Sequence, residues 1–327
     1  MALLSRVAEQ LYWVARYVER AEDTARIVGA YTEVVVDLPV GLGVQWDALL
    51  AIAGGREQFD AEHAKADESS IIDFVVADRS NPSSITSSVR LARENLRSCR
   101  EVMPRLAWQV VNDLHQHVGE HRAEAVSRRS RTRFCDQVVA SSLRFTGVVD
   151  SVLSRDAAFD FLQLGQALER ADMTTRVLGV RAAALMSGER APAAVDASEA
   201  FEASEAYDGV QWMGILRSLS ALQMFQRSTR ASVSGPSVVD FLLMDRYFPR
   251  SVVACLHRIG EALDRLPRGD EVRPAVARVY DVVSMVDAQA DDGELLDQAT
   301  DRIQLALAEL HGRIIETYVA TAPAGTG

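Results

Sequence analysis

A segment of eleven residues rich in acidic and basic side chains occurs twice in this sequence, 150 residues apart. Residues 19–29 and 169–179 both keep Glu-Arg-Ala, an acid, a threonine, an arginine, two aliphatic residues and a glycine at the same spacing. Carboxylates beside guanidinium groups could carry out acid–base chemistry or bind a charged ligand. The candidate site residues are Glu19, Glu22, Arg26, Glu169, Asp172 and Arg176, with Arg20 and Arg170 as secondary candidates.

Both segments are predicted to be helical, because neither contains proline and each has glycine only at its end. At roughly 100° per residue, an apolar stripe centred on Val18 runs along the first helix. Glu22, Arg26 and Glu19 lie within about 100° of that stripe, so they flank or enter the buried side. Arg20 lies at about 200° and is therefore expected to point away from the core.

Two interpretations of this charge cluster stay open. A buried carboxylate must be paired or hydrogen-bonded, and Glu22 and Arg26 form a favourable i, i+4 pair. The cluster is then a structural network of ion pairs between helices. Alternatively, it lines a polar pocket at a pseudo-two-fold interface, where four acids and two arginines approach one another.

Two further charge motifs have both a structural and a functional interpretation. The pairs Asp78-Arg79 and Asp245-Arg246 close short helices before a proline, where the arginine suits the helix dipole and the aspartate could cap a neighbouring helix. A structural role is favoured, although their duplication keeps a pocket role open. The basic run is formed by Arg128, Arg129, Arg131 and Arg133, which could contact phosphate or an acidic partner, or could be a solvated inter-helix turn.

The sequence predicts neither a metal site nor a cofactor. His117 and His121 have a spacing that can hold zinc on one helix face, but no convincing third ligand follows. A di-iron bundle needs Glu-x-x-His on two helices, and neither Glu-Arg helix offers it. There is no Gly-rich phosphate loop, nucleophile elbow or recognisable catalytic triad.

Composition indicates a globular protein that works in the cytoplasm. The chain has 327 residues, 48% of them hydrophobic, and a net charge of −11, which argues against nucleic acid as the main partner. No apolar run has transmembrane length, and charges interrupt the first residues where a signal peptide would be apolar. Cys99, Cys135 and Cys255 have no motif spacing and are expected to be reduced thiols.

The pattern of apolar residues predicts an all-α protein of about twelve helices. The first helix is expected over residues 3–36 and the second from about Trp46 to Gly54, with residues 56–69 as a loop. A short helix over 70–79 is followed by one that begins at Pro82, with Asn81 as its N-cap. Further helices are expected from Pro104 to about residue 126 and over 132–153.

The second half repeats these motifs in the same order. Residues 70–79 return as residues 237–246, at an offset of 167, so the second copy has a longer connection after its Glu-Arg helix. This pattern predicts a tandem duplication, with repeats at 1–155 and 156–320 packed as one pseudo-two-fold symmetric bundle. Residues 187–209 are expected to form an exposed inserted loop and residues 321–327 a flexible tail.

Several blocks of the sequence resemble the alpha-E family, an uncharacterised bacterial helical family named for its Glu-Arg motif. The similar blocks are residues 3–9, 12–13, 17–22, 78–85 and 164–172, and together with the order of motifs the resemblance covers nearly the whole chain. Members of that family are companions of circularly permuted ATP-grasp ligases, often with transglutaminase-like proteases. The resemblance therefore implies a role in ATP-dependent amide or peptide ligation.

Two classes of function follow. The favoured one is a non-catalytic accessory subunit that docks on an ATP-grasp ligase and helps bind or position the acceptor substrate. The alternative is a helical enzyme in which the duplicated Glu/Asp/Arg cluster carries out acid–base chemistry in peptide ligation or modification. The oligomeric state and the ligated substrate are not encoded in any motif that we recognise.

Overall fold

The regular structure of this protein is helical. The computed structural model describes residues 5–37, 46–186, 209–230, 232–288 and 293–319. Within these ranges there is no strand, as predicted, and there are fourteen α-helices where about twelve are expected. Of the predicted loop at 187–209, residues 187–208 lie outside the described residues and Gly209 begins a helix, while the predicted tail 321–327 also lies outside them.

The helices fall into two successive groups. The first group contains α1 (Ser5–Asp37), α2 (Asp47–Ala53), α3 (Arg56–Glu62), α4 (Glu68–Ile72), the π-helix η1 (Asp73–Ala77), α5 (Ile85–Ser98), the 3-10 turn η2 (Arg100–Val102), α6 (Arg105–His121), the 3-10 turn η3 (Arg122–Ala125) and α7 (Arg128–Val152). The second contains α8 (Ala157–Met186), a helix over 209–218, α10 (Leu222–Thr229), α11 (Gly235–Met244), α12 (Val252–Arg265), the 3-10 turn η4 (Gly269–Glu271), α13 (Arg273–Ser284) and α14 (Gly293–Tyr318).

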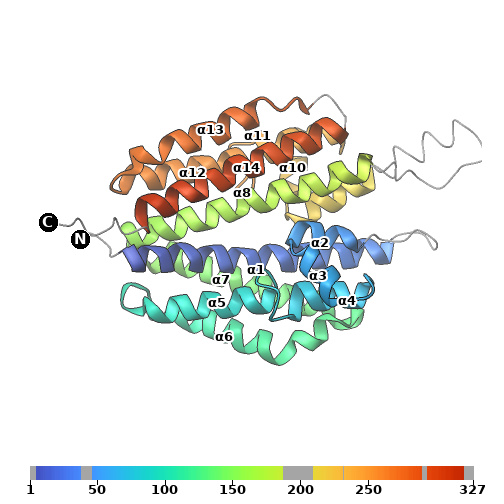
Figure 1. Ribbon diagram of the computed structural model, residues 1–327, viewed down its shortest axis with the longest axis horizontal. Coiled ribbons are helices and arrows are strands. Elements are labelled where there is room, and N and C mark those ends of the chain that lie inside the picture. The colour runs from blue at the N-terminus through green and yellow to red at the C-terminus, as the bar shows by residue number, and fades with distance from the viewer. Residues whose placement is uncertain (1–4, 38–45, 187–208, 231, 289–292, 320–327) are drawn as a thin grey trace, which may run out of the picture.

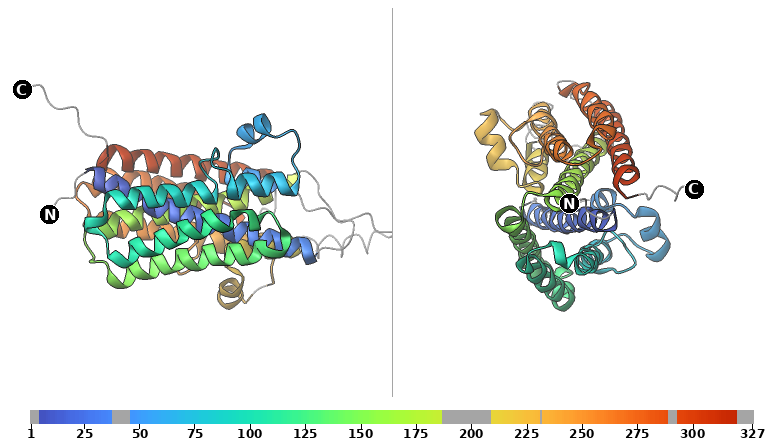
Figure 2. Two further views of the ribbon diagram at one scale, coloured as in Figure 1. Left: turned by 90° about the horizontal axis from the view of Figure 1, so that it is seen from below. Right: turned by 90° about the vertical axis from the view of Figure 1, so that its left-hand side faces the viewer.

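Two long helices, α1 and α8, lie side by side at the centre of the molecule (Figure 1). α1 packs against α5 and α7, and α6 packs against both of these on the outside. α8 packs in the same way against α12 and α14, with α13 outside them. Figure 2 shows the molecule end-on, with α1 and α8 between the two outer groups. Each central helix is therefore covered on both sides.

The close approach of α1 and α8 depends on a glycine. A Cβ atom at Gly165 would lie 2.2 Å from the carbonyl oxygen of Tyr12 and 3.2 Å from the Cβ of Ala15. Since real Cβ atoms do not approach backbone oxygen so closely, any other residue at position 165 would push the two helices apart. This contact lies at the buried interface of α1 and α8. It therefore sets the distance between the two helices, across which the charged side chains near Tyr12, Ala15 and Gly165 meet.

The local boundaries differ from the predictions at two places. The predicted loop at 56–69 is wrong, because it contains α3 and the start of α4, where the Asp67 carboxylate caps the backbone N–H of Ser70 at 3.0 Å. Asn81 is not a helix N-cap. Its side chain donates to the carbonyl of Phe74, and Ser84 caps α5 instead. Short polar segments predict loops, but burial of Phe59 in α3 and of Ile71 and Ile72 in α4 stabilises these short helices by tertiary packing.

None of the described helices has the combination of length and apolar character needed to cross a membrane. The three cysteines are buried and unpaired in disulfides. Burial raises the pKa of each thiol to about 12, so at neutral pH the reactive thiolate is scarcely populated. The predicted boundary at residue 155 lies in the short turn between α7 and α8.

We predict that Gly165→Ala lowers the free energy of unfolding by about 1–3 kcal/mol, because the added methyl group collides with the Tyr12 carbonyl. The matched control is Gly147→Ala inside α7, where an added Cβ meets nothing within 4 Å. That variant should gain up to about 1 kcal/mol from helix propensity. Urea unfolding of both variants tests the contact, and equal stabilisation of the two would contradict it.

Candidate functional site

The duplicated Glu-Arg motifs meet each other across the interface between α1 and α8. The Nε of Arg170 donates to Glu19 Oε1 at 2.6 Å, and the Nε of Arg20 donates to Glu169 Oε1 at 2.6 Å. Each motif thus supplies the carboxylate for the other motif's guanidinium. Glu19 and Glu169 are each only 1% exposed, so both pairs are shielded from water. Such buried charges are stable only when paired and hydrogen-bonded.

Glu169 is bound by two arginines. Arg16 donates from Nε to Glu169 Oε2 at 2.6 Å, and Arg20 also reaches that oxygen from Nη2 at 3.1 Å. Burial by itself disfavours the charged carboxylate, but Arg16 and Arg20 outweigh it and lower the pKa of Glu169 to about 2. This flank of the interface therefore carries more positive than negative charge at its centre.

On the opposite flank, three acidic side chains form ion pairs with the same arginine, Arg250. Arg250, from the segment before α12, donates from Nη2 to Glu22 Oε1 at 2.6 Å and ion-pairs with Glu19 Oε1 at 3.0 Å. Its Nη1 donates to Asp23. The backbone carbonyl of Arg250 accepts a hydrogen bond from the Thr174 hydroxyl of α8 at 2.8 Å, which fixes the segment against the central pair.

These three acids are incompletely satisfied. Among the described residues, one carboxylate oxygen on each of Glu19, Glu22 and Asp23 is buried without a hydrogen-bond partner. Burial raises the pKa of Asp23 to about 8, with Glu19 and Glu22 adding to the effect and Arg250 opposing it. Burial and the Glu19 charge likewise raise the pKa of Glu22. Holding a proton relieves the repulsion between neighbouring carboxylates.

The six predicted site residues divide between these two flanks. Glu19 and Glu22 are on the Arg250 flank, where Arg26 donates to Glu22 within α1 at 2.7 Å. The remaining three are on the other flank, where Arg176 pairs with Asp172 at 3.1 Å. In the part of the chain that the structure describes, no hydrogen bond or ion pair joins Glu19, Glu22 or Arg26 to Glu169, Asp172 or Arg176. The cluster is thus linked across the helices by Arg16, Arg20, Arg170 and Arg250, and not by Arg26 and Arg176.

The prediction for Arg20 is wrong, because its side chain is 19% exposed and points at α8. A helix covered on both sides has no outer face, so one apolar stripe does not define its buried side. Sequence reasoning also missed Arg16, Asp23 and Arg250. Arg16 could have been found from its spacing of four residues to Arg20. Arg250 stands 167 residues after Ser83, at the offset of the predicted duplication, so the difference between these two positions is a signal that the sequence offers.

The secondary candidates Asp78 and Asp245 organise turns. Asp78 accepts from the backbone N–H of Ser80 at 2.7 Å, and Asp245 accepts from those of Tyr247 and Phe248 at 2.8 and 2.7 Å. Each carboxylate therefore orders the loop after its own helix and does not cap a neighbouring one. Their companions Arg79 and Arg246 are exposed.

The basic run lies in the first turns of α7 and not in a solvated turn between helices. Arg131 is 0% exposed and donates to the carbonyls of Ala125 and Val126 and to Glu68. Its proposed contact with a partner is therefore corrected, because a buried guanidinium cannot reach another protein. Arg129 and Arg133 are exposed, and Arg128 is exposed but ion-paired with Glu68.

His117 and His121 stack on each other with ring centroids 4.5 Å apart.

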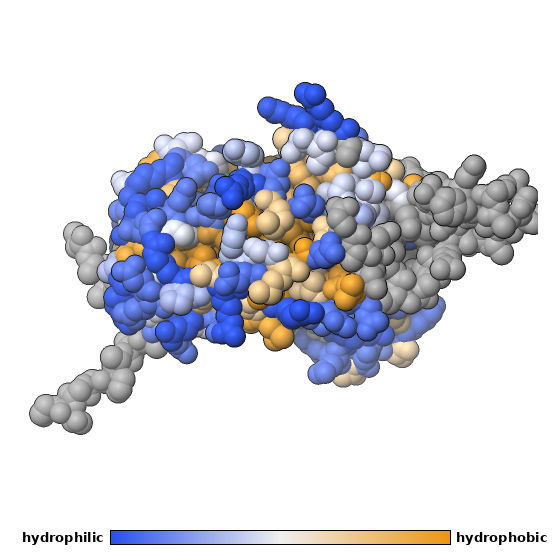
Figure 3. Space-filling model, turned by 90° about the horizontal axis from the view of Figure 1, so that it is seen from above, coloured by the Kyte–Doolittle hydropathy of each residue, from blue (hydrophilic) through white to orange (hydrophobic). Residues whose placement is uncertain are grey.

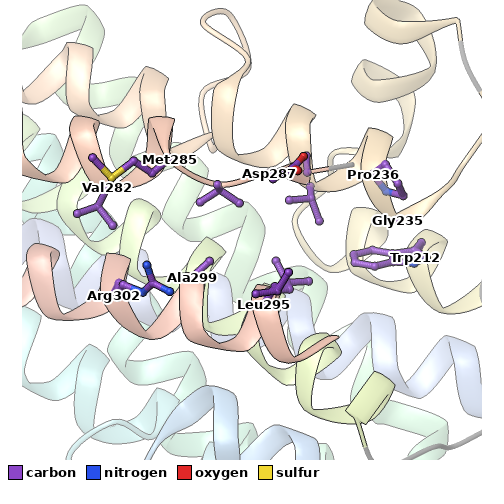
Figure 4. A pocket seen from close by; sticks show the side chains of 13 residues that line it. Trp212, Gly235, Pro236, Val282, Met285, Asp287, Leu295, Ala299 and Arg302 are labelled. Carbon is purple, nitrogen blue, oxygen red and sulfur yellow. The ribbon is translucent and has the colours of Figure 1, made fainter. Parts of the chain in front are cut away.

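Two pockets lie near the second group of helices. A cleft of about 500 Å³ between α8 and α14 has Arg16 of α1 in its wall. A smaller pocket of about 150 Å³ is lined mainly by hydrophobic side chains, among them Trp212, Met285 and Leu295 (Figure 4). The face that includes α13 and α14 has a central hydrophobic area with hydrophilic residues around it (Figure 3). Only the larger cleft adjoins the charge cluster, through Arg16, Asp172 and Arg176.

Comparison with known proteins matches this arrangement to a family defined by its Glu-Arg motif. The family model describes a predicted alpha-helical domain with a conserved ER motif, named alpha-E, and it matches residues 3–319. The chain belongs to the alpha-E family. An uncharacterized protein of Mycobacterium bovis is 25% identical over 93% of the chain, and one of Mycobacterium tuberculosis strain H37Rv is 24% identical over the same share. The chain spans 34% of the length of these relatives, and no solved structure matches it.

The geometry gives the ER motif of this alpha-E chain a physical role. Its carboxylates and guanidinium groups neutralise each other between two helices and leave at most 1% of Glu19, Glu22, Asp23 and Glu169 exposed. A substrate would have to displace α8 from α1, or the Arg250 segment from α1, to reach these carboxylates. The arrangement therefore fixes the register of the two halves, and the adjoining cleft is the part of the site that a ligand can enter.

We predict that Arg250→Ala destabilises the alpha-E chain by about 3–5 kcal/mol, because it leaves three buried carboxylates without their shared cation. Arg56→Ala is the control, since Arg56 forms ion pairs with Asp47 and Asp60 while 53% exposed, and it should cost less than about 1 kcal/mol. Chemical denaturation measures both. Similar small losses in the two variants would mean that the cluster is not a buried network.

Asp23 should make stability depend on pH. The pKa of its carboxyl group rises from an ordinary 3.8 to about 8 on folding. The protonated Asp23 therefore contributes its full amount to the free energy of unfolding below pH 3.8, and this contribution is lost as pH rises toward 8. The slope is at most about 1.4 kcal/mol per pH unit from this single group. Asp23→Asn should flatten the decline in unfolding free energy between about pH 5 and about pH 8. An unchanged slope in the variant would assign the pH dependence to another group.

Proposed function

We propose that this alpha-E chain is an accessory, non-catalytic helical subunit of an ATP-grasp amide or peptide ligase system. It docks on a circularly permuted ATP-grasp ligase and helps bind or position the acceptor substrate, with a transglutaminase-like protease as a further partner. The cytoplasm, where ATP is supplied, is the corresponding location.

One observation carries this proposal. The mycobacterial relatives hold a region similar to this chain within proteins about three times as long, of which the chain covers 34%. A unit that is joined to a longer chain in its relatives is suited to work beside another module. The family resemblance in the sequence supplies the identity proposed for that module, an ATP-grasp ligase.

We also propose that the two halves are a tandem duplication related by a pseudo-two-fold axis parallel to α1 and α8. The reciprocal pairs Glu19–Arg170 and Arg20–Glu169 support it, since a two-fold operation exchanges one pair for the other. The turns before α5 and α12 agree as well. In both, a serine caps the helix while its hydroxyl donates to the carbonyl of the preceding Asp78 or Asp245.

The alternative, an enzyme that uses the duplicated cluster for acid–base chemistry, has one observation in its favour. The raised pKa of Asp23, about 8, would suit a proton-transfer group near neutral pH. A general acid or base must come within hydrogen-bond reach of its substrate. Asp23 is 1% exposed, so the accessory function is the one that the geometry supports better.

The accessory function predicts a complex that depends on the exposed part of the basic run. The chain and a circularly permuted ATP-grasp ligase should elute together on size exclusion at micromolar concentration. Arg129→Glu/Arg133→Glu should weaken the complex by about tenfold or more, because charge reversal repels an acidic partner surface. Arg144→Glu, an exposed change on the same helix, should leave it intact. Separate elution of the two wild-type proteins would refute the proposed assembly.

A further inference from the structure

The cleft between α8 and α14 has the features of a ligand site. Six polar or charged side chains line its volume of about 500 Å³, and aliphatic side chains such as Leu168 and Leu305 complete the wall. The six are Arg16, Asp172, Arg176, Asp301, Gln304 and His311. We propose that this cleft binds a small ligand carrying one carboxylate and one ammonium group, such as an amino acid or a short peptide.

The carboxylate would bind at Arg16. This side chain is 92% removed from solvent (8% exposed), yet it forms part of the cleft wall. Its Nε donates to Glu169, and its Nη1 lies 3.3 Å from His311 Nδ1 and 3.5 Å from the Tyr12 hydroxyl. Within the described residues, Nη2 has no acceptor. Since Glu169 is shared with Arg20, the pair of guanidinium groups retains one positive charge that an anion can neutralise.

His311 supplies a second donor. Arginine can only donate hydrogen bonds, so the Nδ1 that faces Arg16 must accept, and Tyr12 donates to the same atom at 2.8 Å. The ring proton is therefore on Nε2. Burial and the Arg16 charge lower the pKa of His311 to about 4, which keeps the ring neutral at pH 7. A neutral imidazole in this form has Nε2–H as a donor, and His311 is part of the cleft wall.

The remaining charges favour a zwitterion over a phosphate. Arg176 binds Asp172 through Nε only, and within the described residues its terminal nitrogens have no acceptor. Asp301 is an exposed acid of the same cleft. Two carboxylates in the wall would repel a multiply charged phosphate, whereas they complement the ammonium group of an amino acid. The aliphatic side chains accept the nonpolar part of such a ligand.

The opposite flank of α1 and α8 does not offer the same site. Gln166 stands 150 residues after Arg16 and donates to the Thr146 hydroxyl at 3.1 Å. On that flank Arg250 lies directly over Glu22 and Asp23. The two flanks therefore differ in charge at these two positions. Arg16 places a cation at the edge of a cleft on one flank, whereas Gln166 is uncharged.

The experiment uses His311 as a reporter on the isolated full chain, so its outcome does not depend on a ligase. Glycylglycine, acetate and inorganic phosphate are titrated while the histidine ring resonances are followed by NMR, with His311 assigned by its loss in His311→Gln. Glycylglycine should shift this resonance saturably in the millimolar range. The bound carboxylate should also raise the pKa of His311 from about 4 toward 5. The exposed His257 should not respond.

Three variants separate the site from general charge effects. Arg176→Gln should weaken glycylglycine binding by about tenfold, whereas Arg313→Gln, which removes an exposed arginine elsewhere on α14, should not. Asp301→Asn should weaken glycylglycine but not acetate, because only the former has an ammonium group. The proposal is overturned if His311 shows no saturable shift, if Arg313→Gln weakens binding as much as Arg176→Gln, or if phosphate binds more tightly than glycylglycine.

Discussion

The structure depends on the mutual neutralisation of charged side chains between two buried helices. Glu19 and Glu169 could not be removed from water singly, because an unpaired buried carboxylate costs several kcal/mol. They are stable there because each lies 2.6 Å from a guanidinium nitrogen of the other helix. Since both pairs form only at one relative position of α1 and α8, the ion pairs specify the register of the central helices. The close contact at Gly165 specifies their separation.

The two flanks of this interface satisfy their charges differently. One has Arg16 and Arg20 on Glu169, so its acid is ionised and a cation remains to face a cleft. The other has three acids around Arg250, with Arg170 and Arg26 also paired to Glu19 and Glu22, and burial raises the pKa values of Glu22 and Asp23 there. The network is thus locally positive at one flank, whereas at the other flank burial favours the protonated form of two of its acids.

The side chains that stabilise the fold are therefore largely different from the side chains that a ligand could contact. Carboxylates with at most 1% exposure cannot meet a substrate while the helices stay packed. Arg16 serves both purposes, because one side of its guanidinium binds Glu169 and the other belongs to the cleft wall. The free energy that positions it therefore comes from the structural network, and a ligand would not have to order it.

The sequence by itself determined the helical class, most helix positions and the identity of the motif that occupies the interface, because these depend on local periodicity and on repetition along the chain. The tertiary structure decided how the charges pair. A helical wheel assumes a single buried face and therefore places Arg20 on the outside, whereas α1 is covered by α8 on one side and by α5 and α7 on the other. Arg250 is more than two hundred residues from Glu22 in sequence, and only folding brings them within 2.6 Å. Ion pairing over such separations leaves no periodic signal, since it depends on the distance in space and not on the spacing along the chain.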